Sequence, residues 1–393
     1  MNSRSNTFLS DAERDAVIEL RHAMHREPEL SNAEWKTQER IRSVLERFGL
    51  RGIKVFHNTG LYVDIEGTAS GPKRSIAVRG DIDALPIKEA RDDLPYQSQI
   101  NGVMHACGHD MHGSIALGTA LAFHRMRDNF AGRVRVFFQP AEEAEPLGGQ
   151  TVADERLLEG FDRAVGFHVS PEIPAGKFGA REGAVSKSAD QFTVTISGKM
   201  AHGAAPHKGI DAISIAAAFV NEVQKVVSRE MPADDGAVIT VGTIHGGTAA
   251  NIICPSVVMK GTIRTRSPDR RALLSQRLRE VADGVAAMHR GQADCVIRTG
   301  EPPVINDSDM VKRFRQLVHE SVGRDAFNDR KEIAGSDDFG FYSACVPSIY
   351  FWFGSRAPGN ESHVHTPTFG ASDDLIIPTT ELTVRYLLDF LNS

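Results

Sequence analysis

The sequence predicts an α/β domain into which a smaller α+β domain is inserted. Up to residue 183, and again after residue 298, apolar strand-like runs alternate with helical patterns, which is typical of a mostly parallel sheet covered by helices. Residues 184–298 instead follow the order strand, helix, strand, strand, helix, strand, the ferredoxin-like signature. A length of 393 residues suits two such domains. We expect one domain at 1–183 plus 299–393 and the other at 184–298.

The elements of the first domain follow from capping residues and periodicity. Asp11 can cap the first helix, and Pro28 would end it. Small residues on one side of the helix after residue 110 indicate close packing on a sheet. We expect helices at Ala12–Glu27, Ala33–Phe48, Met111–Met126, Leu147–Glu159, Met310–Val322 and Thr379–Leu391, and strands at Ile53–His57, Leu61–Glu66, Ser75–Gly80, Arg133–Gln139, Arg163–Val169 and Ser348–Phe353.

The elements of the second domain follow from a change in pattern near residue 184. Alternating apolar and polar residues indicate strands with one buried face, and two longer segments are amphipathic at helical spacing. We expect strands at Ser188–Ser197, Ala237–Ile244, Val257–Arg266 and Cys295–Arg298, and helices at Ile210–Arg229 and Pro268–Ala287.

Composition excludes several classes of protein. With 45 Lys and Arg against 51 Asp and Glu, the net charge is −6, without the basic footprint of a nucleic-acid binder. No run of 18 apolar residues predicts a membrane span, and the first residues lack the apolar stretch of a signal peptide. Four cysteines in this length do not make a disulfide framework. We therefore expect a cytoplasmic protein with reduced thiols.

Four segments carry side chains of the metal-ligating kind, each where a strand is expected to give way to a loop or helix. They are His105–Asp110, Gln139–Glu143, Phe167–Val169 and His363–Pro367. In open α/β sheets ligands bind at that edge. Any one segment alone is a weak signal, since a lone histidine is usually structural. Their joint occurrence favours a metal site.

The mixed set of thiol, imidazole and carboxylate suits a borderline-soft dication such as zinc, and manganese also fits. Glu142 and Glu143 are adjacent carboxylates, so a metal would hold one ionised while the other takes a proton from activated water. Cys107 could also be a buried apolar thiol or a nucleophile paired with His109. We expect no ligand role for His57, His105, His112 and His124.

Taken together, these segments resemble the M20 metallopeptidases, and specifically their amidohydrolase branch of hippurate hydrolases, indole-3-acetyl-amino-acid hydrolases and N-acyl-amino-acid deacylases. The resemblance runs in order from about residue 15 to 390. It is carried by Arg79–Pro86 (RGDIDALP), His105–Asp110 (HACGHD), Gln139–Glu143 (QPAEE) and the lone His168. It implies a zinc-peptidase-like catalytic domain and an inserted ferredoxin-like dimerisation or lid domain.

The resemblance also implies two divalent metal ions, zinc or manganese, bridged by the thiolate of Cys107. The ligand set would be completed by His109, Glu143, His168 and His365, with His363 as the fallback for the last. Glu142 would be the general base. Asp81 would support the ligands from behind.

The second domain carries a further part of the resemblance. Gly198–His207 (GKMAHGAAPH) resembles a family segment whose first histidine, here His202, reaches the partner's active site and stabilises the oxyanion. Asn251 and Arg264 match positions expected to hold the substrate carboxylate, for which a guanidinium is well suited. On its chemistry alone, Arg264 could equally form a surface ion pair. The implied assembly is a homodimer or a higher homo-oligomer.

The implied function is hydrolysis of the amide bond of N-acyl or N-aroyl amino acids to a carboxylic acid and a free amino acid. The expected partner is therefore a small molecule, with no nucleic acid and no membrane. A dipeptidase or an aromatic-amine deaminase would use the same centre. The residues also allow a non-catalytic, metal-stabilised binding dimer and thiol catalysis by Cys107. The intact Glu142 speaks against the binding dimer, because a scaffold has no use for a second carboxylate beside the metal.

Overall fold

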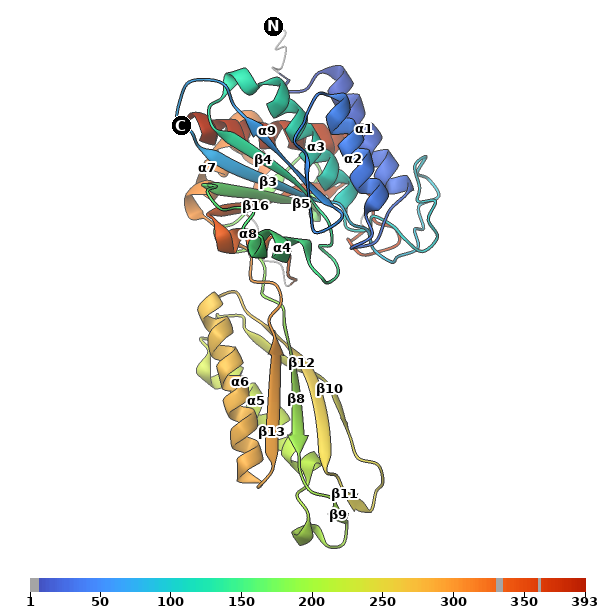
Figure 1. Ribbon diagram of the computed structural model, residues 1–393, viewed down its shortest axis with the longest axis vertical. Coiled ribbons are helices and arrows are strands. Elements are labelled where there is room, and N and C mark those ends of the chain that lie inside the picture. The colour runs from blue at the N-terminus through green and yellow to red at the C-terminus, as the bar shows by residue number, and fades with distance from the viewer. Residues whose placement is uncertain (1–6, 330–334, 360–361) are drawn as a thin grey trace. The chain divides into compact units, whose positions relative to one another are not determined.

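The computed structural model describes residues 7–329, 335–359 and 362–393 (Figure 1). The chain divides into two compact units. Unit 1 takes in the described residues of 1–183, 305–332 and 341–393, and unit 2 those of 184–304 and 333–340. Each unit has its own cluster of buried hydrophobic side chains.

Unit 1 is built on an eight-stranded sheet in the order β1-β2-β4-β3-β5-β16-β6-β15. The strands are β1 (Lys54–Phe56), β2 (Gly60–Glu66), β3 (Ser75–Asp81), β4 (Arg133–Gln139), β5 (Arg163–Pro174), β6 (Phe178–Ala180), β15 (Phe327–Asp329) and β16 (Ser348–Arg356). The central strands β4, β3, β5 and β16 are mutually parallel, whereas β1 pairs with β2, β2 with β4 and β16 with β6 in antiparallel fashion. The predicted α/β class with a mostly parallel sheet is confirmed.

Helices cover the sheet of unit 1. They are α1 (Asp11–Arg26), α2 (Trp35–Arg47), α3 (His109–Arg125), α4 (Gly148–Asp154), α7 (Ser308–Ser321), α8 (Gly340–Cys345) and α9 (Ile376–Asn392). On β4, Val136 faces α3, while its neighbour Phe137 contacts Tyr342 of α8 from the opposite face, with ring centroids 5.6 Å apart. Within the described part of the chain, no helix combines the length and apolar character needed to cross a bilayer.

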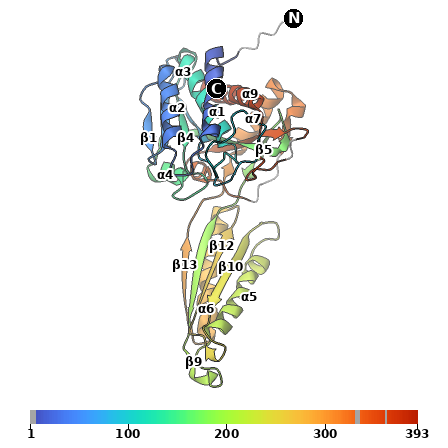
Figure 2. The same ribbon diagram turned by 90° about the vertical axis from the view of Figure 1, so that its right-hand side faces the viewer.

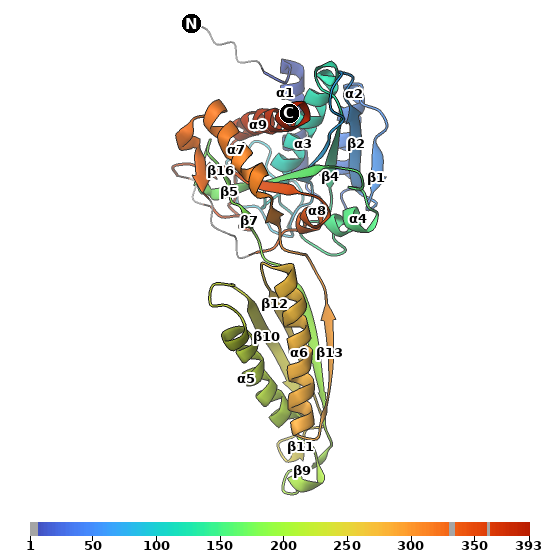
Figure 3. The ribbon, with the colours of Figure 1, turned by 90° about the vertical axis from the view of Figure 1, so that its left-hand side faces the viewer.

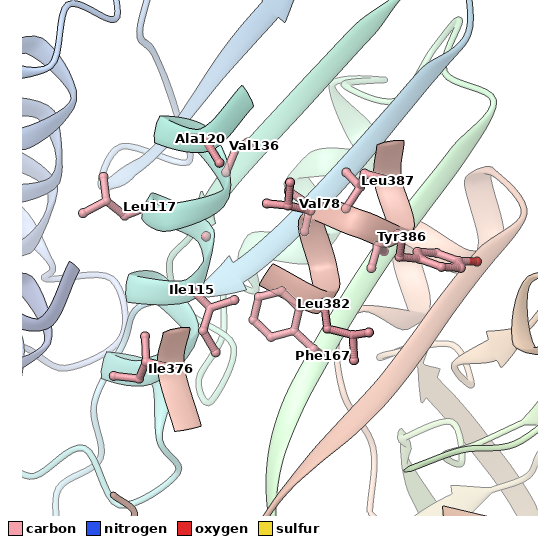
Figure 4. Close-up of a cluster of buried hydrophobic side chains, with 14 of the residues drawn as sticks. Val78, Ile115, Leu117, Ala120, Val136, Phe167, Ile376, Leu382, Tyr386 and Leu387 are labelled. Carbon is pink, nitrogen blue, oxygen red and sulfur yellow. The ribbon is translucent and has the colours of Figure 1, made fainter. Parts of the chain in front are cut away.

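The core of unit 1 lies between the sheet and helices α3 and α9 (Figure 4). Val78 of β3 and Phe167 of β5 project from the sheet toward Ile115 of α3 and Leu382 of α9. All four side chains are buried. Because α3 packs this firmly on the sheet, the turn at its first residue is held at the carboxyl edge of the parallel strands.

A buried ionic network ties α1 to the start of α3. His25 lies between two carboxylates, with Nδ1 2.9 Å from Asp110 Oδ2 and Nε2 3.0 Å from Glu89 Oε1. Burial alone would lower the pKa of His25, but the hydrogen bonds with Asp110 and Glu89 outweigh it and raise the pKa to about 9. Arg21 pairs with the same Asp110 and with Asp373, which follows the segment that carries His365.

The pKa of His25 predicts a pH-dependent contribution to stability. It is fully present below pH 6.5, where the unfolded histidine is also charged, and is lost as the pH rises to about 9. We expect the free energy of unfolding to fall over that window by an amount on the order of 2–3 kcal/mol that is absent in His25→Gln. Denaturant titrations of both proteins at the two pH values measure the free energy of unfolding. An equal change with pH in the wild type and in His25→Gln would contradict this prediction.

Unit 2 contains a four-stranded antiparallel sheet in the order β10-β12-β8-β13, with both long helices on one face (Figures 2 and 3). Its strands are β8 (Asp190–Ser197), β10 (Val238–Gly246), β12 (Ser256–Arg264) and β13 (Gln292–Arg298), and its helices are α5 (Ala212–Glu230) and α6 (Pro268–Met288). At one end, β9 (Ala201–His202) pairs with β11 (Ile252–Ile253). The short strands β7 (Gly183–Ala184) and β14 (Ile305–Asn306) lie where the chain passes between the units. The predicted ferredoxin-like order is confirmed.

Some element bounds differ from those predicted. The helix predicted at 147–159 is α4, which ends at Asp154 because Arg156 adopts a left-handed φ of 53°. Strand β5 continues past Val169 to Pro174, although prolines at 171 and 174 lack the N–H of a regular ladder. Its partner β16 accommodates them through a register shift between Gly354 and Arg356. His168 therefore lies within a strand and not at its end.

Candidate metal centre

A tight turn at the start of α3 places Cys107 and His109 side by side. Gly108 between them adopts a left-handed φ of 85° as the N-cap of α3. A Cβ atom there would lie 2.6 Å from Cγ1 of Val169 on β5. Only glycine fits this turn, because both the backbone angle and the space exclude a side chain.

His109 presents one ring nitrogen that lacks a hydrogen-bond partner. Its Nδ1 lies 3.0 Å from both the backbone oxygen and the carboxylate Oδ1 of Asp83. Its Nε2 is buried and has no hydrogen-bond partner among the described residues. A carboxylate that fixes one nitrogen of a buried imidazole, with the other left over, is the arrangement of a metal-ligating histidine.

The sulfur of Cys107 lies between two histidines from distant parts of the chain. It is 3.2 Å from Nε2 of His168 on β5 and 3.2 Å from Nε2 of His365 in the loop after β16. His168 is oriented through Nδ1, which lies 2.6 Å from the backbone oxygen of Val169. Cys107 thus belongs to two groups of ligand atoms within 4.8 Å of one another, one with His109 and His168 and one with Glu143 and His365.

The loop after β4 brings Glu142 and Glu143 to the same place. Both carboxylates lie within 4.8 Å of a ring nitrogen of His109, and Glu143 Oε1 is 2.9 Å from His365 Nε2. Two residues here that are not glycine have left-handed backbone angles, Ala141 with φ 51° and His365 with φ 62°. Such strain persists only where the surroundings fix it, and it is common at functional sites.

The charges around Cys107 and His109 fit a bound cation. Burial, and then the carboxylates of Glu143 and Glu142, raise the pKa of the Cys107 thiol well above its usual value. Burial would lower the pKa of His109, but Asp81 and Asp83 outweigh it and raise the pKa to about 10. Without a cation, this buried group of acids would be costly. A divalent metal would neutralise it and deprotonate the thiol outright.

Asp81 lies behind this group at the end of β3. It accepts hydrogen bonds from His112 Nδ1 at 2.6 Å and from the buried guanidinium of Arg79, and its Oδ2 is 3.7 Å from Nε2 of His109. Burial would raise the pKa of Asp81, but the charges of Arg79, His109 and His112 hold it well below its usual value. His112 Nε2 in turn accepts the backbone N–H of Val169, beside His168. Asp81 and His112 thereby support the strand that carries His168.

Three predicted site residues lie in unit 2, at both ends of its sheet. His202 and Asn251 are close together, because Gly203 donates its N–H to the backbone oxygen of Asn251 and His202 pairs with Ile252. Arg264 ends β12, whose nine residues span about 26 Å from the end near His202. Nη1 of Arg264 is buried without a hydrogen-bond partner in the described chain. One carboxylate cannot contact both Asn251 and Arg264 of a single unit 2.

The structure also brings together residues that the sequence did not single out. Asp83 holds His109 and also accepts the backbone N–H of Glu143 at 3.0 Å. Glu34 accepts the N–H of Ala141 at 2.9 Å. Asp83 could have been predicted from the sequence, since it lies two residues after Asp81, the last residue of β3. His363 and His365 are both exposed, but among the described residues only His365 belongs to a ligand group.

The fold and these convergent ligand side chains are those of a metal-dependent hydrolase. The sequence of this chain matches the model of peptidase family M20/M25/M40 over residues 77–389, and the chain belongs to that family. The resemblance identified from the motifs is thereby confirmed.

Three relatives support the assignment. The uncharacterized hydrolase y4tI of Sinorhizobium fredii is 73% identical over 393 residues, or 100% of this chain and 98% of that protein. An N-acetyl-L-cysteine deacetylase of Bacillus subtilis is 36% identical over 361 residues, or 92% of this chain and 85% of the relative. The Bacillus subtilis protein YXEP, a dinuclear metal-binding peptidase of the M20 family, superposes with a TM-score of 0.83 at 30% identity, covering 97% of this chain and 99% of that structure.

Proposed function

We propose that this protein is a binuclear metal-dependent amidohydrolase that cleaves N-acyl or N-aroyl amino acids into a carboxylic acid and a free amino acid. The observation that carries the proposal is the sulfur of Cys107, which two groups of ligand atoms share while a second carboxylate, Glu142, lies beside them. The deacetylase and the dinuclear peptidase among the relatives support the reaction class and the number of metal ions.

The proposed ligand set follows the two groups of side chains. One divalent ion, zinc or manganese, would be held by Cys107, His109 and His168, and the other by Cys107, Glu143 and His365. Bound there, the ions supply Lewis acidity to the amide carbonyl and to a water molecule. Thiolate, imidazole and carboxylate together suit either metal.

In the proposed reaction Glu142 carries the proton. Its carboxylate takes a proton from the attacking water and delivers it to the amine nitrogen as the carbon–nitrogen bond breaks. With Nδ1 of His109 held by Asp83, Nε2 would be the ring nitrogen that binds the metal ion. The raised pKa of Cys107 argues against thiol catalysis, because a free thiol there would be protonated at neutral pH.

We also propose that the active protein is a homodimer joined through residues 184–298. His202 and Asn251 of one subunit would act in the site of the other, where His202 stabilises the tetrahedral oxyanion and Asn251 contacts the substrate carboxylate. Arg264 would bind the same carboxylate from its own subunit. The length of β12 supports this division. Arg264 ends this strand, which spans about 26 Å from the end near Asn251, so one carboxylate cannot contact both residues of the same subunit.

Mixing two inactive variants tests the shared site. His202→Ala and Glu142→Gln proteins, each inactive alone, are expected to recover activity when their subunits exchange. Half the dimers of an equal mixture are hybrids with one intact site, so recovery should approach roughly a quarter of the wild-type rate. Exchange is confirmed by mass spectrometry of differently tagged subunits. No recovery despite exchange would place His202 outside the shared site.

A substrate panel tests the reaction. Purified protein loaded with zinc or manganese is assayed on acetyl, benzoyl and indoleacetyl amino acids. Dipeptides and an aromatic amine are assayed in parallel as substrates of the two alternative enzymes. We expect a free amino acid and a carboxylic acid from the acylated substrates. Preferential dipeptide cleavage would favour a dipeptidase, and ammonia released from the amine would favour a deaminase. No turnover with full metal loading would favour a binding dimer.

A further inference from the structure

Two buried carboxylates hold the backbone on either side of Glu142. Glu34 Oε1 accepts the N–H of Ala141 at 2.9 Å, and Asp83 Oδ2 accepts the N–H of Glu143 at 3.0 Å. The side chains of both carboxylates are fully buried. Asp83 also contacts His109, which explains its place beside the metal centre. Glu34 contacts none of the proposed ligands in the hydrogen bonds and ion pairs of the described chain, so its burial needs another reason.

Helix α2 does not supply that reason. Glu34 is the N-cap residue of α2, yet its side chain makes no capping hydrogen bond. The first turn of α2 is served instead by Glu29, whose carboxylate accepts the N–H groups of Lys36 and Thr37. The second oxygen of Glu34 accepts the hydroxyl of Thr59 at 2.7 Å. The contacts of Glu34 therefore point toward the loop after β4 and away from its own helix.

Burying Glu34 is costly. Burial, and then the nearby charge of Asp83, raise the pKa of Glu34 to about 7. A buried carboxyl is tolerated where hydrogen bonds stabilise it, and here one of those hydrogen bonds fixes the backbone of Ala141. Ala141 has a left-handed φ of 51°, a strained conformation for an alanine whose cost the surroundings must offset.

We propose that Glu34 is a positioning residue for Glu142. By fixing the N–H of Ala141 it imposes the left-handed turn from which the next residue, Glu142, reaches His109 and Glu143. This inference rests on the proposed function, in which Glu142 transfers the proton. The proposed ligands other than Glu143 are held by other elements, and Glu143, on the same loop, keeps its own contact to Asp83.

Removing the Glu34 carboxyl should therefore affect chemistry more than binding. In Glu34→Ala the peptide at Ala141 relaxes and Glu142 moves away from the attacking water. A misplacement of about 1 Å costs on the order of 100-fold in rate, so we expect kcat to fall 10- to 100-fold with KM within about twofold. Metal content should stay at the wild-type value.

The test compares four variants of the metal-loaded enzyme. Glu34→Gln keeps an oxygen for the Ala141 N–H and should retain kcat. Glu34→Ala should lose it, and Glu34→Asp, too short to reach both Ala141 and Thr59, should lose it even if the alanine variant fails to fold. Glu29→Ala is the matched control, because it weakens the start of α2 without touching the loop. It should lower Tm and leave kcat unchanged.

Hydrogen–deuterium exchange of the peptide covering residues 138–143 supplies a readout independent of activity. We expect faster exchange there in Glu34→Ala and Glu34→Asp than in the wild type, Glu34→Gln or Glu29→Ala. Unchanged exchange and kcat in Glu34→Ala, with Glu142→Gln inactive, would overturn the positioning role. If Glu142→Gln is itself fully active, the proposed function fails, and the exchange data still decide whether Glu34 orders the loop.

Discussion

Replacing Glu142 by glutamine is expected to lower kcat by about 100- to 10,000-fold, the usual contribution of a general base. The amide has nearly the shape of the carboxylate but cannot accept the proton of the attacking water. The proposed ligands Cys107, His109 and Glu143 are untouched, so metal content should stay unchanged. Steady-state kinetics together with elemental analysis of the dialysed protein measure both quantities.

The matched control is Glu145→Gln, which neutralises an exposed carboxylate three residues further along the same loop. It should keep wild-type kcat and metal content. If Glu142→Gln retains full activity, Glu142 is not the proton carrier. If it loses metal together with activity, Glu142 belongs to the ligand set and another group must be the base.

Replacing Cys107 by serine is expected to weaken binding of both metal ions. The sulfur lies 3.2 Å from His168 Nε2 and from His365 Nε2, so both groups of ligands lose the member they share. Mutating a residue that only hydrogen-bonds to a metal ligand typically costs about 10- to 100-fold in metal affinity, so we expect a loss of at least about 100-fold when the shared ligand itself is replaced. Competition with a chelator of known affinity, for zinc and for manganese, gives the value.

Cys345→Ser provides the control for that experiment, because Cys345 is exposed and belongs to no ligand group among the described residues. Its metal affinity should equal that of the wild type. Unchanged metal affinity in Cys107→Ser would exclude a bridging thiolate. Loss of only one ion would assign the sulfur to a single metal.

Much of the fold, and the proximity of several candidate site residues, could be predicted from the sequence. Alternating elements reveal a parallel sheet, and the chain order of the motifs reveals the family, so Cys107 and His168 could be expected near each other. Glu34 could not be found this way, because its partner Ala141 is 107 residues away and the contact is to a backbone N–H, which leaves no trace in side-chain chemistry.

The separation of Asn251 from Arg264 was also beyond reach of the sequence. The two residues are 13 positions apart in the chain, which alone suggests proximity. The regular nine-residue strand β12 separates them, and an extended strand has the largest rise per residue of the regular structures. Whether nearby positions share a site thus depends on the secondary structure between them.

If Cys107 binds metal as proposed, its buried thiol would make metal uptake a proton-releasing event. Because burial, and then the nearby carboxylates, raise the pKa of this thiol, a cation bound there would have to displace its proton. The apparent metal affinity would then drop by about tenfold for each pH unit of acidification. A mildly acidic environment would strip the ions from this protein sooner than from one whose sites consist of carboxylates alone.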